Sequence, residues 1–132
     1  KKLVNFLKGR KNIHLLGYIE YNCLPFYEKS FDVGIIPYRI NDFTRGISPI
    51  KVFEYLAFGK PVVATQIPAL ETLNTKGLIK VTTNKEDFLK LIIQYLAYDS
   101  LDAYNSRIDF ARVNTWEKRV EFISGVLDKY IR

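Results

Sequence analysis

The sequence contains few of the residues that build disulfide frameworks and metal centres. Among its 132 residues there is one cysteine, Cys23, one histidine, His14, and no methionine. An intrachain disulfide, a thiolate zinc cluster and a two-histidine metal site are therefore excluded. No apolar run reaches the ~18 residues that a membrane-spanning helix needs. Since the chain starts at Lys1 and has no methionine, we expect it to be a piece of a longer protein.

The remaining composition is that of an ordinary globular domain. Hydrophobic residues make up 48% and charged residues 26% of the chain, which excludes a disordered or collagen-like protein. The net charge is +6, and the first eleven residues carry several lysines and arginines but no acid. Such a basic end suits contact with anionic lipid or nucleic acid, or a solvated helix end. We favour the solvated end and expect no nucleic-acid partner, because no strip of aromatic and basic residues follows it.

Short apolar segments alternate with helical patterns along the chain. We predict strands at four of these segments: Asn12–Tyr18, Val33–Pro37, Pro61–Thr65 and Leu78–Thr82. We predict helices up to Gly9, at Leu24–Ser30, at Ser48–Phe58, after a cap at Asn84, at Leu101–Val113, and after a cap at Thr115. This alternation predicts an α/β fold with a parallel sheet covered by helices on both faces.

Ligands of such sheets bind beyond the carboxyl ends of the strands. Three predicted loops lie there: Gly17–Asn22, Tyr38–Ser48 and Gln66–Leu70. Glu71 directly follows the last of these loops, and it either lines the crevice or only starts a short helix. His14 lies in a predicted strand, where we expect a packed or edge residue. Cys23 has no patterned partner and is not expected to be a catalytic thiol.

The helix predicted to begin at Ser48 is the clearest element of the sequence. Ser48 is a suitable cap, Pro49 suits the first helical position, and Gly59 suits the residue after its end. The first amides of a helix have no internal partner and lie at its positive end, so this start can bind phosphate. Because Pro49 has no amide hydrogen, the donors there are those of Ser48, Ile50 and Lys51.

One carboxylate on this helix suits a nucleotide. From Ser48 to Glu54 the helix rises about 9 Å, roughly the distance from the phosphates of a nucleotide to its ribose hydroxyls. A carboxylate can accept two hydrogen bonds from such a diol. However, Lys51 and Glu54 are three residues apart and can equally form an ordinary exposed ion pair. Helix geometry alone favours that ion pair.

The sequence around this helix resembles a known family. Residues 48–65, SPIKVFEYLAFGKPVVAT, resemble the donor-binding signature of GT-B glycosyltransferases of the large retaining group called family 4, or glycosyl transferases group 1. The segments Asn12–Gly17, Leu24-Pro25 and Asp32–Tyr38 are similar to the stretch that precedes this signature in the family. The resemblance runs from about residue 12 to residue 96, and the helix at Trp116 also fits it.

The resemblance implies a Rossmann-like fold, the C-terminal donor half of a GT-B enzyme, truncated at its N-terminus. Residues 1–132 would form a partial nucleotide-sugar-binding domain whose C-terminal helices occupy about 101–131. Two strands and the acceptor-binding half would precede residue 1. The parent enzyme would transfer a sugar from a nucleotide diphosphate sugar to a glycan or lipid-linked acceptor in polysaccharide biosynthesis. It would need no metal or other cofactor.

The same resemblance implies a cytoplasmic protein, with peripheral contact at the inner membrane face left open. We expect the chain by itself not to turn over a donor. Two alternatives of the same fold also stay open. One is a non-catalytic nucleotide-binding or interaction module, and the other is a nucleotide-sugar epimerase, which would need acid–base residues near the sugar.

Site residues follow from the resemblance position by position. Glu54 corresponds to the glutamate that binds the ribose hydroxyls of the donor. Gly46 stands where many members have a second glutamate, which contacts the sugar, so Arg45, Thr44 or Asp42 are candidates for that contact here. No residue is assigned as a general base, and the catalytic residues are unknown. The remaining matches are the helix start that faces the diphosphate (Ser48, Ile50, Lys51) and the loop whose backbone contacts the nucleobase (Tyr18, Ile19).

Overall fold

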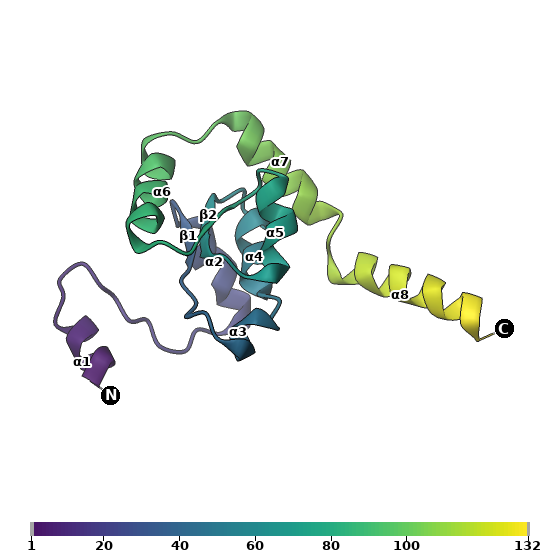
Figure 1. Cartoon of the computed structure of the whole chain (residues 1–132), viewed down its shortest axis with the longest axis horizontal. Helices are drawn as coiled ribbons and strands as arrows, with labels where there is room; N and C mark the ends of the chain where they lie inside the picture. Colours follow the sequence, from purple (N-terminus) through teal and green to yellow (C-terminus); the bar gives the residue numbers. More distant parts are fainter. Residues whose placement is uncertain (1, 132) are drawn as a thin grey trace.

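A three-stranded parallel sheet forms the centre of the computed structural model, which describes residues 2–131 (Figure 1). Its strands are β1 (Gly34–Ile36), β2 (Val62–Thr65) and β3 (Lys80–Thr82), in the order β1-β2-β3. Both neighbouring pairs are parallel, as predicted. Each strand lies within a segment predicted to be one, although each is shorter than its segment.

Helices cover both faces of this sheet (Figure 1). Helices α4 (Ile50–Ala57) and α5 (Pro68–Thr75) lie on one face, and α6 (Lys85–Ala97) lies on the other. Helix α7 (Leu101–Arg112) packs on the outside of α4. This arrangement confirms the predicted α/β fold with a parallel sheet flanked by helices.

Strand β2 lies in the middle of the core. Val62, Val63 and Ala64 are completely buried, since neighbouring strands flank them and helices cover both faces. A central parallel strand therefore consists of consecutive apolar residues rather than alternating ones. The other buried apolar residues come from β1, α4, α5 and the segment before β3: Ile36, Val52, Leu56, Ile67, Leu70, Leu73, Leu78 and Ile79.

The predicted caps of the C-terminal helices are confirmed. The side chain of Asn84 accepts hydrogen bonds from the backbone N–H groups of Glu86 and Asp87, at 2.8 and 3.0 Å. The hydroxyl of Thr115 accepts one from the N–H of Lys118, at 3.4 Å, at the start of α8 (Trp116–Tyr130). Such bonds satisfy amides that have no partner within the helix.

Helix α8 projects from the body of the molecule (Figure 1). Its apolar side chains are therefore largely exposed, from 38% for Val126 to 83% for Tyr130. At the other end, α1 (Lys2–Lys8) also stands apart from the sheet. None of the helices within residues 2–131 combines the length and apolar composition needed to cross a membrane.

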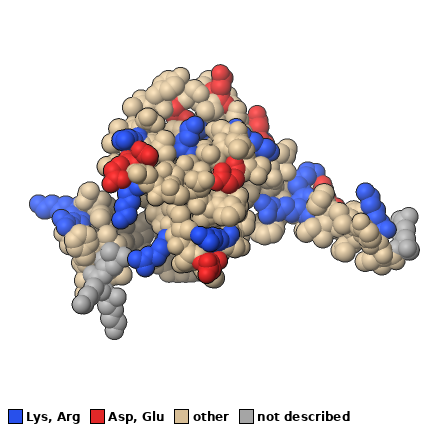
Figure 2. Space-filling model, in the orientation of Figure 1, with Lys and Arg blue, Asp and Glu red and all other residues tan. Residues whose placement is uncertain are grey.

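Three basic side chains of the N-terminal segment are described and exposed, namely those of Lys8, Arg10 and Lys11. Lys1 lies outside the described residues. Basic side chains are visible near both ends of the molecule, whereas acidic and basic side chains are mixed over its body (Figure 2). Arg10 also lies over the ring of Phe6, 4.5 Å from its centroid.

The predicted strand Asn12–Tyr18 is wrong. These residues have no regular secondary structure, and Leu15 and Leu16 are 46% and 55% exposed. A strand is stable only when its backbone groups pair with a neighbouring strand. Within residues 2–131, no strand lies beside this segment.

Two predictions on the N-terminal half need correction. Ser48 does not cap α4, because Pro49 is the cap residue in an extended conformation, no side chain caps the helix, and α4 begins at Ile50. The predicted loop after β1 contains a short helix, α3 (Asp42–Arg45). Asn41 and Thr44 stabilise its start reciprocally, each side chain accepting from the other's backbone N–H at 2.9 Å.

The segment between α1 and β1 ends in two short helices. These are the 3-10 helix η1 (Tyr21–Cys23) and α2 (Leu24–Lys29), which lies within a segment predicted to be helical and has a proline in its first turn. Glu28 is the only buried residue of α2. An acidic side chain thus points from α2 into the protein, where it needs a partner.

Candidate functional site

The start of α4 presents free backbone amides. No hydrogen bond from the amides of Ile50 and Lys51 is found within residues 2–131, and Val52 bonds weakly to the carbonyl of Pro49 at 3.3 Å. These N–H groups lie at the positive end of the helix dipole. The cap and the first helical residue each lie one position later than predicted, and anion binding at this helix start stays a prediction.

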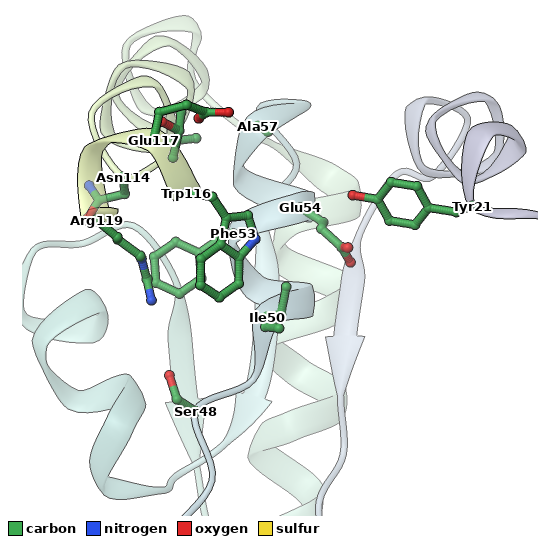
Figure 3. A pocket seen from close by; sticks show the side chains of 12 residues that line it. Tyr21, Ser48, Ile50, Phe53, Glu54, Ala57, Asn114, Trp116, Glu117 and Arg119 are labelled. Carbon is green, nitrogen blue, oxygen red and sulfur yellow. The ribbon is translucent and has the colours of Figure 1, made fainter. Parts of the chain in front are cut away.

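A pocket of about 440 Å³ lies beside α4, between this helix and the start of α8 (Figure 3). Most of its lining is apolar or aromatic, and a few charged groups reach its edge. The lining residues are Tyr21, Ser48, Ile50, Phe53, Glu54, Ala57, Ala111, Asn114, Thr115, Trp116, Glu117 and Arg119. Its size and mixed lining suit a small organic ligand with a few polar groups.

Glu54 reaches this pocket from the middle of α4 (Figure 3). Its side chain is 26% exposed, so part of the carboxylate remains accessible. The other part is enclosed, since Oε2 is shielded from solvent and makes no hydrogen bond of normal geometry. The ammonium of Lys51 lies 2.8 Å from this oxygen.

Lys51 is shared between two carboxylates. Its Nζ lies 2.9 Å from Oε1 of Glu28 as well as 2.8 Å from Oε2 of Glu54. The ordinary exposed pair that the spacing predicts is therefore present, but it includes a third, buried group. The three side chains together carry one net negative charge. The positive charge of Lys51 is therefore already balanced by two carboxylates.

This sharing has a measurable effect on the protonation of Lys51. Burial by itself would lower its pKa, but the neighbouring carboxylates of Glu54 and Glu28 outweigh burial and raise the pKa above the ordinary 10.5. The folded state therefore binds this proton more tightly than the unfolded state does. The resulting stabilisation is complete below pH 10.5 and is lost as the pH rises toward the folded pKa.

We therefore expect the free energy of unfolding to fall above about pH 10.5, and to fall less steeply in the variant Lys51→Met. Urea unfolding at several pH values between 9 and ~12 measures the two slopes. Lys90→Met is the matched control, because Lys90 forms an exposed pair with Asp87 at 3.2 Å on α6. Equal slopes for the wild type and Lys51→Met would contradict the prediction.

Alternating cations and aromatic rings connect the pocket to the rest of the fold. The guanidinium of Arg119 lies over the ring of Phe53 at 4.7 Å, and that ring stacks on Phe110 at 6.3 Å. The ammonium of Lys76 lies over the ring of Phe110, 5.1 Å from its centroid. Cation–π contacts of this kind contribute about 0.5–1 kcal/mol each at exposed sites. They hold the start of α8 against α4 and so form one wall of the pocket.

The structure brings together part of the predicted site. Ser48, Ile50 and Glu54 line the pocket, and Lys51 contacts Glu54 beside it. Tyr18 and Ile19 do not line it. Tyr18 is 84% exposed, and Tyr21 lines the pocket in place of this pair.

Arg45 and Gly46 also lie outside the pocket lining. Arg45 ends α3 and lies 3.8 Å from Asp42 on its exposed surface, and Gly46 follows as the C-terminal cap. Thr44 is buried in the capping interactions of α3 and is not available for a ligand. Of the three residues suggested for the sugar contact, Arg45 and Asp42 are thus exposed and Thr44 is not.

The structure also shows where the remaining candidate residues lie. Glu71 lies in the first turn of α5 and accepts a hydrogen bond from Gln66 at 2.6 Å. Of the two interpretations of Glu71, its position agrees with the one in which it starts a helix. His14 is exposed on the segment without regular structure, so the prediction of a packed or edge strand residue is wrong. Cys23 is exposed. Among residues 2–131, no three His, Cys, Asp or Glu side chains are grouped to hold a metal ion.

Sequence reasoning missed the residues that reach the pocket from α8 and from η1. Arg119 and Trp116 follow α7, far along the chain from α4, and no local spacing connects them to Glu54. Phe53 is half-buried and also lines the pocket. The helix prediction alone could not show that α8 begins beside α4.

A parallel sheet flanked by helices is consistent with a Rossmann-like glycosyltransferase domain. Comparison with known proteins agrees. Residues 1–98 match the family described as glycosyl transferases group 1, and the chain belongs to this family. The membership predicted from residues 48–65 is thereby confirmed.

A curated relative is TuaH of Bacillus subtilis (strain 168), which is named for a proposed role as a teichuronic acid biosynthesis glycosyltransferase. The two sequences are 29% identical over 108 residues, which cover 80% of this chain and 27% of the relative. The chain thus spans about a quarter of the relative's length. No solved structure matches the chain significantly.

Proposed function

We propose that this chain binds the nucleotide diphosphate sugar of a glycosyltransferase. The observation that carries the proposal is Glu54, whose carboxylate reaches the pocket while its enclosed oxygen faces an ammonium. From Ile50 to Glu54 the helix rises about 6 Å. This rise is shorter than the about 9 Å expected from Ser48, so the diphosphate would extend beyond Ile50 toward Ser48 while the ribose lies beside Glu54.

Each group has a distinct role in this proposal. Glu54 accepts hydrogen bonds from the two ribose hydroxyls, which a carboxylate does well. The free amides of Ile50 and Lys51 face the diphosphate, together with the hydroxyl of Ser48. Lys51 contributes its backbone amide and not its ammonium, because the ammonium is already paired with two carboxylates.

The helix start also has a catalytic consequence. During transfer, the bond between the anomeric carbon and the diphosphate oxygen breaks and the diphosphate leaves with its electron pair, while the acceptor hydroxyl oxygen bonds to the anomeric carbon and releases its proton to the diphosphate or to water. Fixed amide dipoles that face the leaving oxygens stabilise this developing charge without reorganising. We assign no general base, metal ion or further cofactor to this chain.

The remaining contacts are proposed from the matching positions of the family. The backbone at Tyr18 and Ile19 would contact the nucleobase, and Arg45 beside Gly46 would contact the sugar. For the acceptor we propose a growing glycan or a lipid-linked glycan, since TuaH is named for teichuronic acid biosynthesis. We propose a cytoplasmic location, where the exposed basic N-terminal segment suits peripheral contact with an anionic inner membrane face.

Calorimetric titration with UDP, GDP and ADP tests the donor site. We expect one of these nucleotides to bind, and Glu54→Ala to weaken its binding by about 2 kcal/mol, because a hydrogen bond to a charged group is lost. Glu117→Ala is the matched control, since Glu117 also lines the pocket but comes from α8. Binding of no nucleotide, or equal losses in both variants, would contradict the proposal.

A non-catalytic nucleotide-binding module of the same fold is the second candidate. The observation that favours it is Gly46, which offers no side chain where many members of the family have a glutamate. Release of nucleoside diphosphate from a nucleotide sugar in the presence of acceptor, measured on the whole protein, distinguishes the two. Binding without release would favour the module.

A further inference from the structure

Glu28 is a charged side chain in an unusual place. It is 5% exposed and is the only buried residue of α2, a helix whose other side chains are partly or fully exposed. Removing a carboxylate from water is costly unless it is paired and hydrogen-bonded. Its described partner is the ammonium of Lys51, which donates a hydrogen bond to Oε1 at 2.9 Å.

We propose that Glu28 is a positioning residue of the donor site, which holds Lys51 so that Lys51 fixes the Glu54 carboxylate for the ribose diol. This inference rests on the proposed function. It concerns a residue that comes from a different helix and does not line the pocket.

The contacts among these three side chains support this positioning role. Glu28 is immobile because it is buried, whereas Lys51 is a long side chain that is 46% exposed and would otherwise be mobile. Held by Glu28, the ammonium stays 2.8 Å from Oε2 of Glu54, the oxygen that is enclosed. The remaining part of the Glu54 carboxylate is then directed toward the ligand in one orientation.

The net charge of Glu28, Lys51 and Glu54 determines which ligand atoms can bind beside them. Two carboxylates and one ammonium leave one net negative charge, which repels a phosphate but accepts hydrogen bonds from hydroxyls. The other group that senses these charges is the hydroxyl of Tyr55, on the same face of α4. The group therefore suits the diol of the ribose, and the phosphates belong at the helix start.

The test compares two probes that differ only in the diol. For whichever of UDP, GDP and ADP binds most tightly, its affinity is divided by that of its 2′,3′-dideoxy counterpart, and this ratio is the diol preference. We expect a preference of about tenfold or more in the wild type and little in Glu54→Gln, since hydrogen bonds to a charged acceptor are stronger than those to a neutral one.

Glu28→Gln has nearly the same volume and removes only the charge. We expect it to lower the diol preference roughly fivefold while leaving the affinity for the dideoxy probe unchanged. In the double variant Glu28→Gln/Glu54→Gln, the preference should be no lower than in Glu54→Gln alone, because Glu28 acts through Glu54. Glu28→Asp, which keeps the charge, should retain more of the preference than Glu28→Gln.

Two further variants complete the design. Glu86→Gln is the matched control, because Glu86 is exposed in the first turn of α6, and its preference should equal that of the wild type. Lys51→Arg keeps the positive charge but changes the donor geometry, and it should also lower the preference. This second variant tests the same chain of contacts if Glu28→Gln does not fold.

The outcomes separate the inference from the proposed function. If Glu28→Gln weakens both probes equally, Glu28 is only structural and the inference is wrong. If Glu28→Gln and Lys51→Arg both keep the full diol preference while Glu54→Gln loses it, the proposed donor site is supported and the positioning role of Glu28 is wrong. If the wild type binds no nucleotide or shows no diol preference, the proposed function itself is wrong, and the positioning role falls with it.

Discussion

Replacing Arg107 by methionine should lower the free energy of unfolding by about 4 kcal/mol. Arg107 is 1% exposed, and its Nε donates a hydrogen bond to the carbonyl oxygen of Gly59 at 2.8 Å. Its guanidinium also forms an ion pair with Asp99. The variant leaves a buried carbonyl and a carboxylate without their partner, and both are costly to desolvate.

Urea unfolding of the variant and its controls measures this effect. Arg112→Met is the matched control on the same helix, since Arg112 pairs with Asp109 at 3.1 Å on the exposed surface and should contribute less than about 1 kcal/mol. Adding Asp99→Asn to Arg107→Met should recover part of the loss, because the unpaired carboxylate is then gone. A loss as small as that of Arg112→Met would show that Arg107 does not hold α7 against α4.

Replacing Gly59 by alanine should lower the free energy of unfolding by about 3 kcal/mol. Gly59 ends α4 with φ at +66°, a conformation that costs other residues about 1 kcal/mol or more. An added Cβ would also lie 2.3 Å from Cε2 of Tyr104 on α7, so the ring must move. Steric and backbone costs therefore add at this position.

Gly77→Ala separates the two costs, because Gly77 has φ at +71° but nothing within 4 Å of an added Cβ. This control should lose only about 1 kcal/mol. Combining Gly59→Ala with Tyr104→Leu should recover part of the steric cost. If Gly59→Ala and Gly77→Ala lose the same free energy in urea unfolding, close packing of Tyr104 on Gly59 contributes nothing.

Helix ends could be predicted from the sequence because their chemistry is local. Asn84 and Thr115 each accept from an N–H two or three residues further along, within one turn. Ser48 failed as a cap because the extended conformation of Pro49 places the helix start after it. The capping pair of Asn41 and Thr44 was visible in the sequence, but polar residues around it favoured a loop.

Strands were less predictable because their stability depends on neighbours. The segments that form β1, β2 and β3 were recognised by their apolar runs, and they pair with one another. Asn12–Tyr18 has the same apolar character and forms no strand. Apolar residues indicate that a segment tends to be buried, but they do not indicate what buries it.

The candidate site was predictable only within α4 and its start. Ser48, Ile50 and Glu54 lie within seven residues, so helix geometry relates them. Glu28 lies 23 residues from Lys51, and no periodicity connects the two. Arg119 likewise reaches Phe53 only because α7 turns the chain back toward α4.

Helix α8 places a tryptophan, Trp116, in the wall of the pocket, where its fluorescence can serve as an intrinsic probe. Trp116 lines the pocket, is 64% exposed, and has the guanidinium of Arg119 5.6 Å from its ring. Indole emission responds to solvent and to nearby charge, and the sequence contains no second tryptophan. Excitation at the red edge of the indole band, where the nine tyrosines absorb little, therefore reports changes in the surroundings of Trp116 without any attached dye.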